Sequence, residues 1–265
     1  MSLFFDFGSN WKNFSANRLD EDRVRAAESS LLENIGAERL AGRSFLDVGC
    51  GSGLFSIAAA RVGAQPVCGF DINPTGIETS IQNAGRFLTN GAPPPDFIRG
   101  SVLDAQFLST LGTFDTVYAW GSLHHTGRMW DAIRYTADLV KPGGHFVLAI
   151  YNPHWSSPAW KQIKRLYNVS PAFAQKSMTA LFGVAIYGAV LLTTRRSPFT
   201  KERGMDFWYD VIDWLGGYPY EVASISQLEE FLKPSGFRLL HVVRPRVPTG
   251  CNELLFERIS STAPA

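Results

Sequence analysis

The chain has little of what marks a secreted, metal-binding or nucleic-acid-binding protein. Its 265 residues include three cysteines, Cys50, Cys68 and Cys251, which are too far apart for a zinc motif or a disulfide framework. The net charge of +1 provides no broad basic surface for nucleic acid. The segment from Met1 to Asp6 lacks the basic and apolar regions of a signal peptide. These absences predict a cytoplasmic protein with no resident metal and no nucleic-acid partner.

What remains is an ordinary globular composition, with 45% apolar and 18% charged residues. The length suits one core with an insertion. We expect four parts: an N-terminal extension and helix over 1–40, a nucleotide-binding core over 41–151, an inserted aromatic cap over 152–224, and a last helix and strand hairpin over 225–265.

The stretch from Ser44 to Asp71 has the pattern strand, glycine loop, helix, strand. An apolar strand ends at Val48, and the loop Gly49-Cys50-Gly51-Ser52-Gly53 follows directly. Glycine lets the backbone approach a ligand closely, and the N-terminus of the following helix favours an anionic group. The pattern predicts a βαβ unit that binds a nucleotide at the loop.

Two acids favour S-adenosylmethionine over a nicotinamide dinucleotide. Asp71 ends the second strand, where a carboxylate can accept hydrogen bonds from ribose hydroxyls. Asp47 stands just before the loop, where its charge would repel a pyrophosphate and attract the ammonium of a methionine moiety. The third glycine of the dinucleotide pattern is replaced by Leu54. A nicotinamide-dependent oxidoreductase therefore stays only as an alternative.

These residues resemble motif I and the acidic strand end of the class I S-adenosylmethionine-dependent methyltransferases. The resemblance continues through Tyr151, and the segments Gly100–Asp104, Leu123–Trp130 and Gly250–Glu253 are similar to a bacterial subgroup that acts on small molecules. It implies an α/β fold: a Rossmann-like, mostly parallel seven-stranded sheet with helices on both faces and an inserted helical cap.

The resemblance also implies the residues that hold the cofactor. Asp104 would accept a hydrogen bond from the adenine amine and Val102 would pack on the ring; the alternative for Asp104 is to cap a helix over 105–111. The expected cofactor-binding residues are Asp47, Gly49, Cys50, Gly51, Gly53, Asp71, Ile72, Val102, Leu103, Asp104 and Trp120.

A histidine pair follows the fourth predicted strand, Phe114 to Trp120. His124 and His125 lie in the loop after this strand, at the sheet edge where ligands bind in open α/β folds. A histidine suits the removal of one proton from a methyl acceptor, so one of the pair is the predicted general base. The alternative is that both only shape the loop.

The remaining candidates are expected to contact the substrate. The N-terminal aromatics either close over the cofactor or anchor the chain to the core. A last helix is predicted over 226–232 with Ser226 as its N-cap, and the connector over 244–252 is expected to return to the site. The substrate candidates are Trp11, Tyr151, His154, Asn252 and Glu253.

Within the cap, the 18 residues from Ser177 to Thr194 carry no charge and predict a buried helix. A homodimer contact through this helix and a membrane surface stay open as alternatives.

The sequence thus predicts methyl transfer to a small molecule, with oxygen as the expected acceptor atom. No Asn-Pro-Pro-Tyr-type segment follows the fourth strand, which disfavours DNA bases and glutamine amides as acceptors. Nitrogen or sulfur acceptors, lipid-like acceptors and a non-catalytic scaffold stay open.

Overall fold

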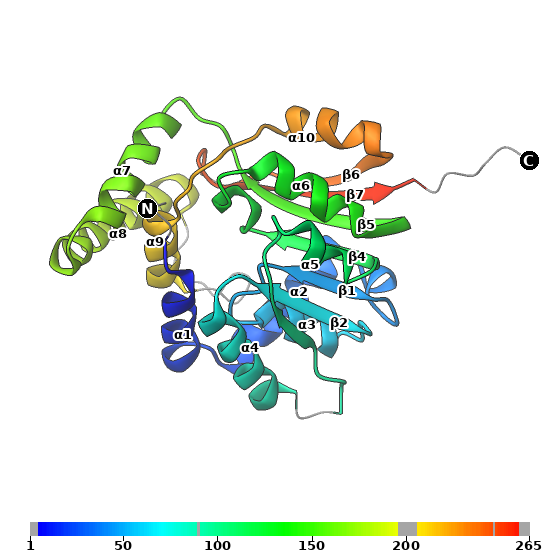
Figure 1. Ribbon diagram of the computed structural model, residues 1–265. Coiled ribbons are helices and arrows are strands. Elements are labelled where there is room, and N and C mark those ends of the chain that lie inside the picture. The colour runs from blue at the N-terminus through cyan, green and yellow to red at the C-terminus, as the bar shows by residue number, and fades with distance from the viewer. Residues whose placement is uncertain (1–4, 89–90, 196–205, 246, 260–265) are drawn as a thin grey trace, which may run out of the picture.

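The computed structural model describes every residue except 1–4, 89–90, 196–205, 246 and 260–265. Its centre is a seven-stranded sheet with the order β3-β2-β1-β4-β5-β7-β6 (Figure 1). The strands are β1 (Phe45–Val48), β2 (Val67–Asp71), β3 (Asp96–Arg99), β4 (Phe114–Trp120), β5 (Val140–Tyr151), β6 (Phe237–Val243) and β7 (Cys251–Arg258). The pairs among β1 to β5 are parallel, whereas β7 is antiparallel to both β5 and β6. The predicted Rossmann-like sheet is therefore confirmed.

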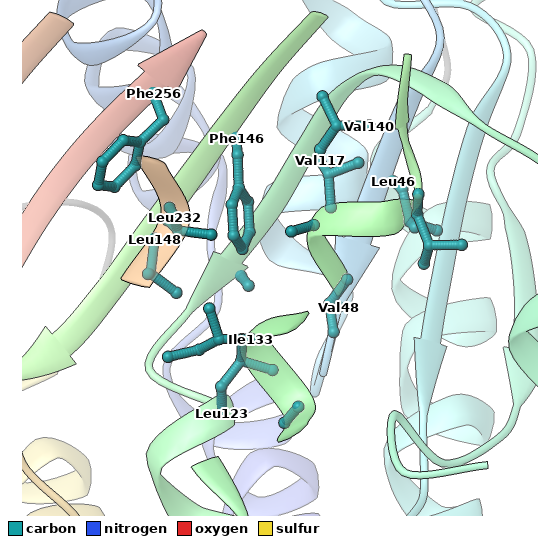
Figure 2. Close-up of a cluster of buried hydrophobic side chains, with 14 of the residues drawn as sticks. Leu46, Val48, Val117, Leu123, Ile133, Val140, Phe146, Leu148, Leu232 and Phe256 are labelled. Carbon is teal, nitrogen blue, oxygen red and sulfur yellow. The ribbon is translucent and has the colours of Figure 1, made fainter. Parts of the chain in front are cut away.

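Helices cover both faces of the sheet. The residues buried under one face come from α2 (Glu21–Asn34), α3 (Leu54–Arg61) and α4 (Pro74–Phe87). The other face is covered by α5 (Ala105–Ser109), α6 (Met129–Asp138) and α10 (Ile225–Leu232). Figure 2 shows part of this second cluster, in which Phe146 and Phe256 of the sheet lie with Leu232 of α10. The two apolar clusters fix the strand ends that carry the loops of the site.

Helix α10 begins earlier than the sequence indicates. Ser224, not Ser226, is its N-cap: its hydroxyl accepts from the Gln227 N–H, and the Gln227 side chain accepts from the Ser224 N–H. The earlier start brings Ile225 into the first turn, where it packs against the core. Two serines, each followed by a glutamine or glutamate three residues later, offer equivalent capping boxes, and burial of Ile225 selects the first.

Three cap helices, α7 (Ser157–Val169), α8 (Ala172–Thr194) and α9 (Phe207–Gly216), lie between β5 and α10 in the chain. They stand beside the sheet, on the left of Figure 1, around a small core of Tyr167, Val211 and Leu215. The prediction of a buried helix over 177–194 is wrong. Only 6% of the apolar window of α8 is buried, because the helix packs through one face against α7 and α9 and leaves the rest open.

The N-terminal helix α1 (Phe7–Asn17) joins the cap helices to the nucleotide-binding half. It packs against both α4 and α9. Phe14 is fully buried in the core, whereas Trp11 lies against the glycine loop. Phe14 thus anchors the N-terminal helix to the core, and closure of Trp11 over the cofactor stays a prediction.

Candidate active site

The glycine loop between β1 and α3 needs its glycines. Gly49, Gly51 and Gly53 have φ values of +77°, +54° and +75°, a region that other residues enter only at a cost. A Cβ on Gly51 would lie 2.9 Å from Nε1 of Trp11, and one on Gly49 would lie 2.5 Å from Cβ of Ser122. The loop is therefore packed between α1 and the loop that follows β4.

Two carboxylates flank the loop, the buried Asp47 and the half-buried Asp71. Asp71 accepts hydrogen bonds from the backbone N–H of Gly51 at 3.1 Å and of Asn73 at 2.8 Å. Asp47 accepts from the Ser56 hydroxyl at 2.7 Å. Burial raises the pKa of Asp47 to about 7, and the nearby Asp71 carboxylate adds to the effect; burial also raises the pKa of Asp71. Two such acids favour a ligand with positive charge and hydroxyl donors, which fits the methionine and ribose parts of S-adenosylmethionine.

The residues expected around the adenine follow the neighbouring strands β2 and β3. Ile72 is 67% exposed directly after Asp71, while Val102 and Leu103 are half-buried against the core. Asp104 caps α5, because its Oδ1 accepts from the N–H groups of Gln106 at 3.0 Å and Phe107 at 3.1 Å. The helix-capping alternative for Asp104 is therefore present, and its contact with adenine stays a prediction.

Two further predicted cofactor residues complete this edge. Cys50 is buried in the glycine loop, and burial raises the pKa of its thiol well above the ordinary value, so the thiol stays protonated. Trp120 is half-buried at the end of β4, next to the histidine loop.

The histidine loop lies directly against the glycine loop. Ser122 donates from its hydroxyl to the Val48 carbonyl at 2.7 Å, so the ends of β1 and β4 are bonded together. Two residues later, the His124 side chain is 1% exposed. Burial lowers its pKa well below the ordinary value, helped by His125 and Lys164 and offset in part by the Ala149 backbone. His124 is therefore a neutral imidazole inside the protein.

His125 has a defined tautomer. Its Nδ1 lies 2.8 Å from the Pro219 carbonyl oxygen, which can only accept, so Nδ1 carries the proton and Nε2 is left to accept one. Burial and the nearby Lys164 lower its pKa to about 3. The ring is half-buried and packs 5.0 Å from the ring of Phe7.

Lys164 is a site residue that the sequence analysis missed. It lies on α7, is fully buried, and donates to the Trp214 carbonyl. Its ammonium also lies 4.8 Å from the Trp214 ring, 4.9 Å from the Tyr220 ring and 5.4 Å from the Tyr151 ring. Burial lowers its pKa to about 7. The available signal was its place beside Ile163 and three residues before Tyr167, on the apolar stripe of α7.

A second buried polar pair ties α1 to α9. Nδ2 of Asn10 donates to Oδ1 of Asp213 at 2.7 Å, and burial raises the pKa of Asp213 well above the ordinary value. The charge of Lys164 acts on Asp213 and offsets a small part of this rise.

The five predicted substrate residues divide into two groups. Tyr151 joins the site, with its ring 4.2 Å from the His124 ring, and Trp11 covers the glycine loop. His154 is held locally, since its Nδ1 lies 2.7 Å from the Ser156 hydroxyl. The expectation that Asn252 and Glu253 lie on a connector is wrong: both belong to β7, which begins at Cys251.

Asn252 and Glu253 lie in a strand because β7 is already paired with β5 at these positions. Asn252 pairs with Ile150 and donates from its amide to Asn152 at 3.1 Å, so it is buried and extends the β5–β7 ladder. Glu253 pairs with Ala149 in the same ladder. Among the described residues, no group of three His, Cys, Asp or Glu side chains is placed to hold a metal ion.

Comparison with known proteins agrees with this geometry. A family model described as a methyltransferase domain matches residues 19–242. A ribosomal protein L11 methyltransferase of Azotobacter vinelandii is 47% identical over 118 residues, which are 44% of this chain and 37% of that protein. A ubiquinone biosynthesis O-methyltransferase of a Methylobacterium strain is 32% identical over 139 residues, 52% of this chain and 53% of that protein. The chain thus spans about half or less of these curated relatives.

Solved structures show the same fold. The magnesium protoporphyrin IX methyltransferase of Synechocystis PCC 6803, solved with bound SAH, superposes with a TM-score of 0.60 at 18% identity and covers 94% of this chain and 93% of that one. An O-methyltransferase family protein of Burkholderia thailandensis gives 0.56 at 16% identity, over 90% of this chain and 57% of that one. The methyltransferase-domain model over residues 19–242, together with this shared fold, shows that the chain belongs to the class I S-adenosylmethionine-dependent methyltransferases.

Proposed function

We propose that the protein transfers the methyl group to an oxygen of a small molecule, with His125 as the general base. The observation that carries this proposal is the tautomer of His125, which leaves Nε2 as a proton acceptor one strand away from the glycine loop. S-adenosylmethionine supplies an electrophilic methyl group when it is bound. The chain has to position the acceptor, exclude water and remove one proton from a hydroxyl.

The surroundings of His125 support these three tasks. Phe7 of α1, Tyr151 of β5 and the buried Lys164 pack around the histidine pair and exclude water. His124 is too buried to reach an acceptor in this arrangement, so we assign it the role of positioning His125, whose ring lies 4.3 Å away. The lowered pKa of both histidines leaves them unprotonated at neutral pH in the free protein. A general base works best with a pKa near the operating pH, so the role of His125 requires the bound acceptor and cofactor to raise its pKa.

A small acceptor fits the enclosure better than a protein does. Phe7 of α1 packs against the His125 ring, Trp214 of α9 lies beside Lys164, and His124 and Lys164 are buried. A methylated protein must place a side chain and its flanking backbone at the cofactor, which needs an open groove. Methylation of a protein is the second candidate function, and the 47% identity to an L11 methyltransferase favours it.

The test of the base is transfer of labelled methyl groups from S-adenosylmethionine to a host-cell extract by the wild type and by His125→Ala and His124→Ala. We expect His125→Ala to lose about 10²- to 10⁴-fold in initial rate with its affinity for S-adenosylhomocysteine unchanged. His124→Gln retains a buried polar side chain and serves as the milder variant of the positioning residue. Full transfer by His125→Ala would contradict the proposal.

A further inference from the structure

Helix α8 is long and apolar but only partly covered. Over Ala172–Leu192 it is long and apolar enough to cross a membrane by length and composition, and 6% of its apolar window is buried. Met178, Phe182 and Ile186 face the small core of the cap helices. A helix that is apolar on all sides needs a partner on its other face as well.

The uncovered face is continuous. Large apolar side chains are exposed at Phe173 (74%), Leu181 (69%), Val184 (68%) and Leu192 (83%). With 3.6 residues per turn, these positions fall within about 100° of the helix circumference, on the side away from Phe182 and Ile186. Exposed apolar residues of α7 precede them in the chain, Leu166 and Val169. We call α7 and α8 together the α7–α8 hairpin.

The hairpin carries charge of only one sign. Between Asp138 and Glu202 the sequence has no aspartate and no glutamate. Lys161, Arg165, Lys176 and Arg195 are exposed on the hairpin, although the whole chain has a net charge of only +1. An apolar face with basic residues at both ends of its helix complements an anionic lipid surface.

Two of the three acids at the neighbouring α9 are already bonded to other parts of the chain. Asp206 pairs with Arg18 and Arg23 of the N-terminal segment, and Asp213 is bonded by Asn10. Asp210 is the exposed acid of α9. In a two-fold homodimer the same surface of both copies meets, so the basic residues of one hairpin would face those of the other and repel them. The charge therefore favours a lipid surface over a homodimer.

We propose that the α7–α8 hairpin binds the surface of an anionic membrane, with the exposed face of α8 in the headgroup region. The helix lies in the plane of the membrane and does not cross it, since β6 and β7 follow it in the chain and complete the same sheet as β1 to β5. This inference goes beyond the proposed function and does not depend on it, because membrane binding is measured without methyl transfer.

The experiment is co-sedimentation of the full chain with vesicles of phosphatidylcholine, with and without phosphatidylglycerol. We expect binding to the anionic vesicles only, and weaker binding as the salt concentration rises. Leu181→Ser with Val184→Ser should weaken this binding at least tenfold, because each substitution removes an apolar side chain that the membrane would bury. Lys161→Glu with Lys176→Glu should also weaken it at least tenfold, since each basic residue near such a surface contributes severalfold.

Two control variants distinguish binding through this surface from nonspecific binding to vesicles. Ile81→Ser removes an apolar side chain that is 55% exposed on α4, and Lys233→Glu reverses an exposed charge after α10; both should bind vesicles as the wild type does. The proposal is overturned if the wild type ignores anionic vesicles. It is also overturned if the protein is a stable dimer in solution that Leu181→Ser with Val184→Ser converts to a monomer.

Discussion

The carboxylate of Asp71 accepts a hydrogen bond from the backbone N–H of Gly51 at 3.1 Å, across 20 residues of chain. This bond joins the end of β2 to the middle of the glycine loop. It holds one oxygen of Asp71 toward the loop and keeps the charge of the half-buried carboxylate compensated. The loop and the acid are therefore one unit, and the affinity for the cofactor depends on both.

Replacing Asp71 by asparagine should lower the affinity for S-adenosylhomocysteine by about 10- to 100-fold, the range for a lost hydrogen bond to a charged group. Isothermal titration calorimetry measures this loss. Asp96→Asn, an exposed acid on the adjacent strand β3, is the control and should bind as the wild type does. Unchanged affinity in Asp71→Asn would refute its role in the cofactor site.

Cofactor binding should release a proton from Asp47. Its pKa of about 7 in the free protein means that it is half protonated at neutral pH, and a cationic ligand favours the ionised form. Affinity for S-adenosylmethionine should therefore rise as the pH rises, by up to about tenfold between about pH 6 and 8. Calorimetry in buffers of different ionisation enthalpy detects the released proton. Asp47→Asn should remove this dependence, and its persistence in that variant would assign the proton to another group.

Lys164 should make the stability of the protein depend on pH. Its pKa is about 7 in the folded state and the ordinary value of 10.5 in the unfolded chain, so between these values the unfolded state binds more protons. Stability from this residue is therefore lowest below about pH 7 and rises as the pH increases.

The measurement is the difference in unfolding free energy between Lys164→Met and the wild type. Lys164→Met should be the more stable protein at pH 7, and its advantage should shrink by about 2 kcal/mol by about pH 9. The variant also removes the charge that acts on His124, His125 and Asp213, so the difference reports Lys164 together with its effect on these groups. A constant difference across this range would show that the lysine titrates as in water.

Asn10→Ala should destabilise the packing of α1 on α9. The change leaves the buried Asp213 without the donor at 2.7 Å, at a cost of about 1–3 kcal/mol in urea unfolding. Asn13→Ala, an exposed position on the same helix, keeps the backbone carbonyl that accepts from Asn17 and Tyr209 and should cost less than about 0.5 kcal/mol. Equal effects of the two variants would mean that the Asn10 contact contributes nothing specific.

The sequence predicts the nucleotide-binding half well because its signals are local. Gly49, Gly51 and Gly53 follow a strand directly, and the acid at the next strand end is one helix away. Such a unit folds the same way wherever its neighbours lie. The strand order and the antiparallel β6–β7 pair follow from the family resemblance rather than from any residue pattern.

The cap side of the site was predicted less well because it depends on tertiary packing. From the sequence alone Lys164 is expected to be an exposed lysine, because the contacts with α9 and Tyr220 that bury it come from distant parts of the chain. The assignment of Asn252 to a connector is wrong because β7 begins a few residues earlier than expected and already pairs with β5 there. The burial of α8 depends on which helices pack beside it, and the sequence pattern of α8 alone does not predict how much of the helix is buried.

The central claim is transfer of a methyl group to a small molecule. The most direct measurement incubates the purified protein with methyl-labelled S-adenosylmethionine and a host-cell extract, then divides the extract into small-molecule, lipid, protein and nucleic-acid fractions. We expect label in the small-molecule fraction, and at limiting cofactor much less label with Asp71→Asn than with the wild type. Label confined to the protein fraction would contradict it and would make the L11-type activity the function.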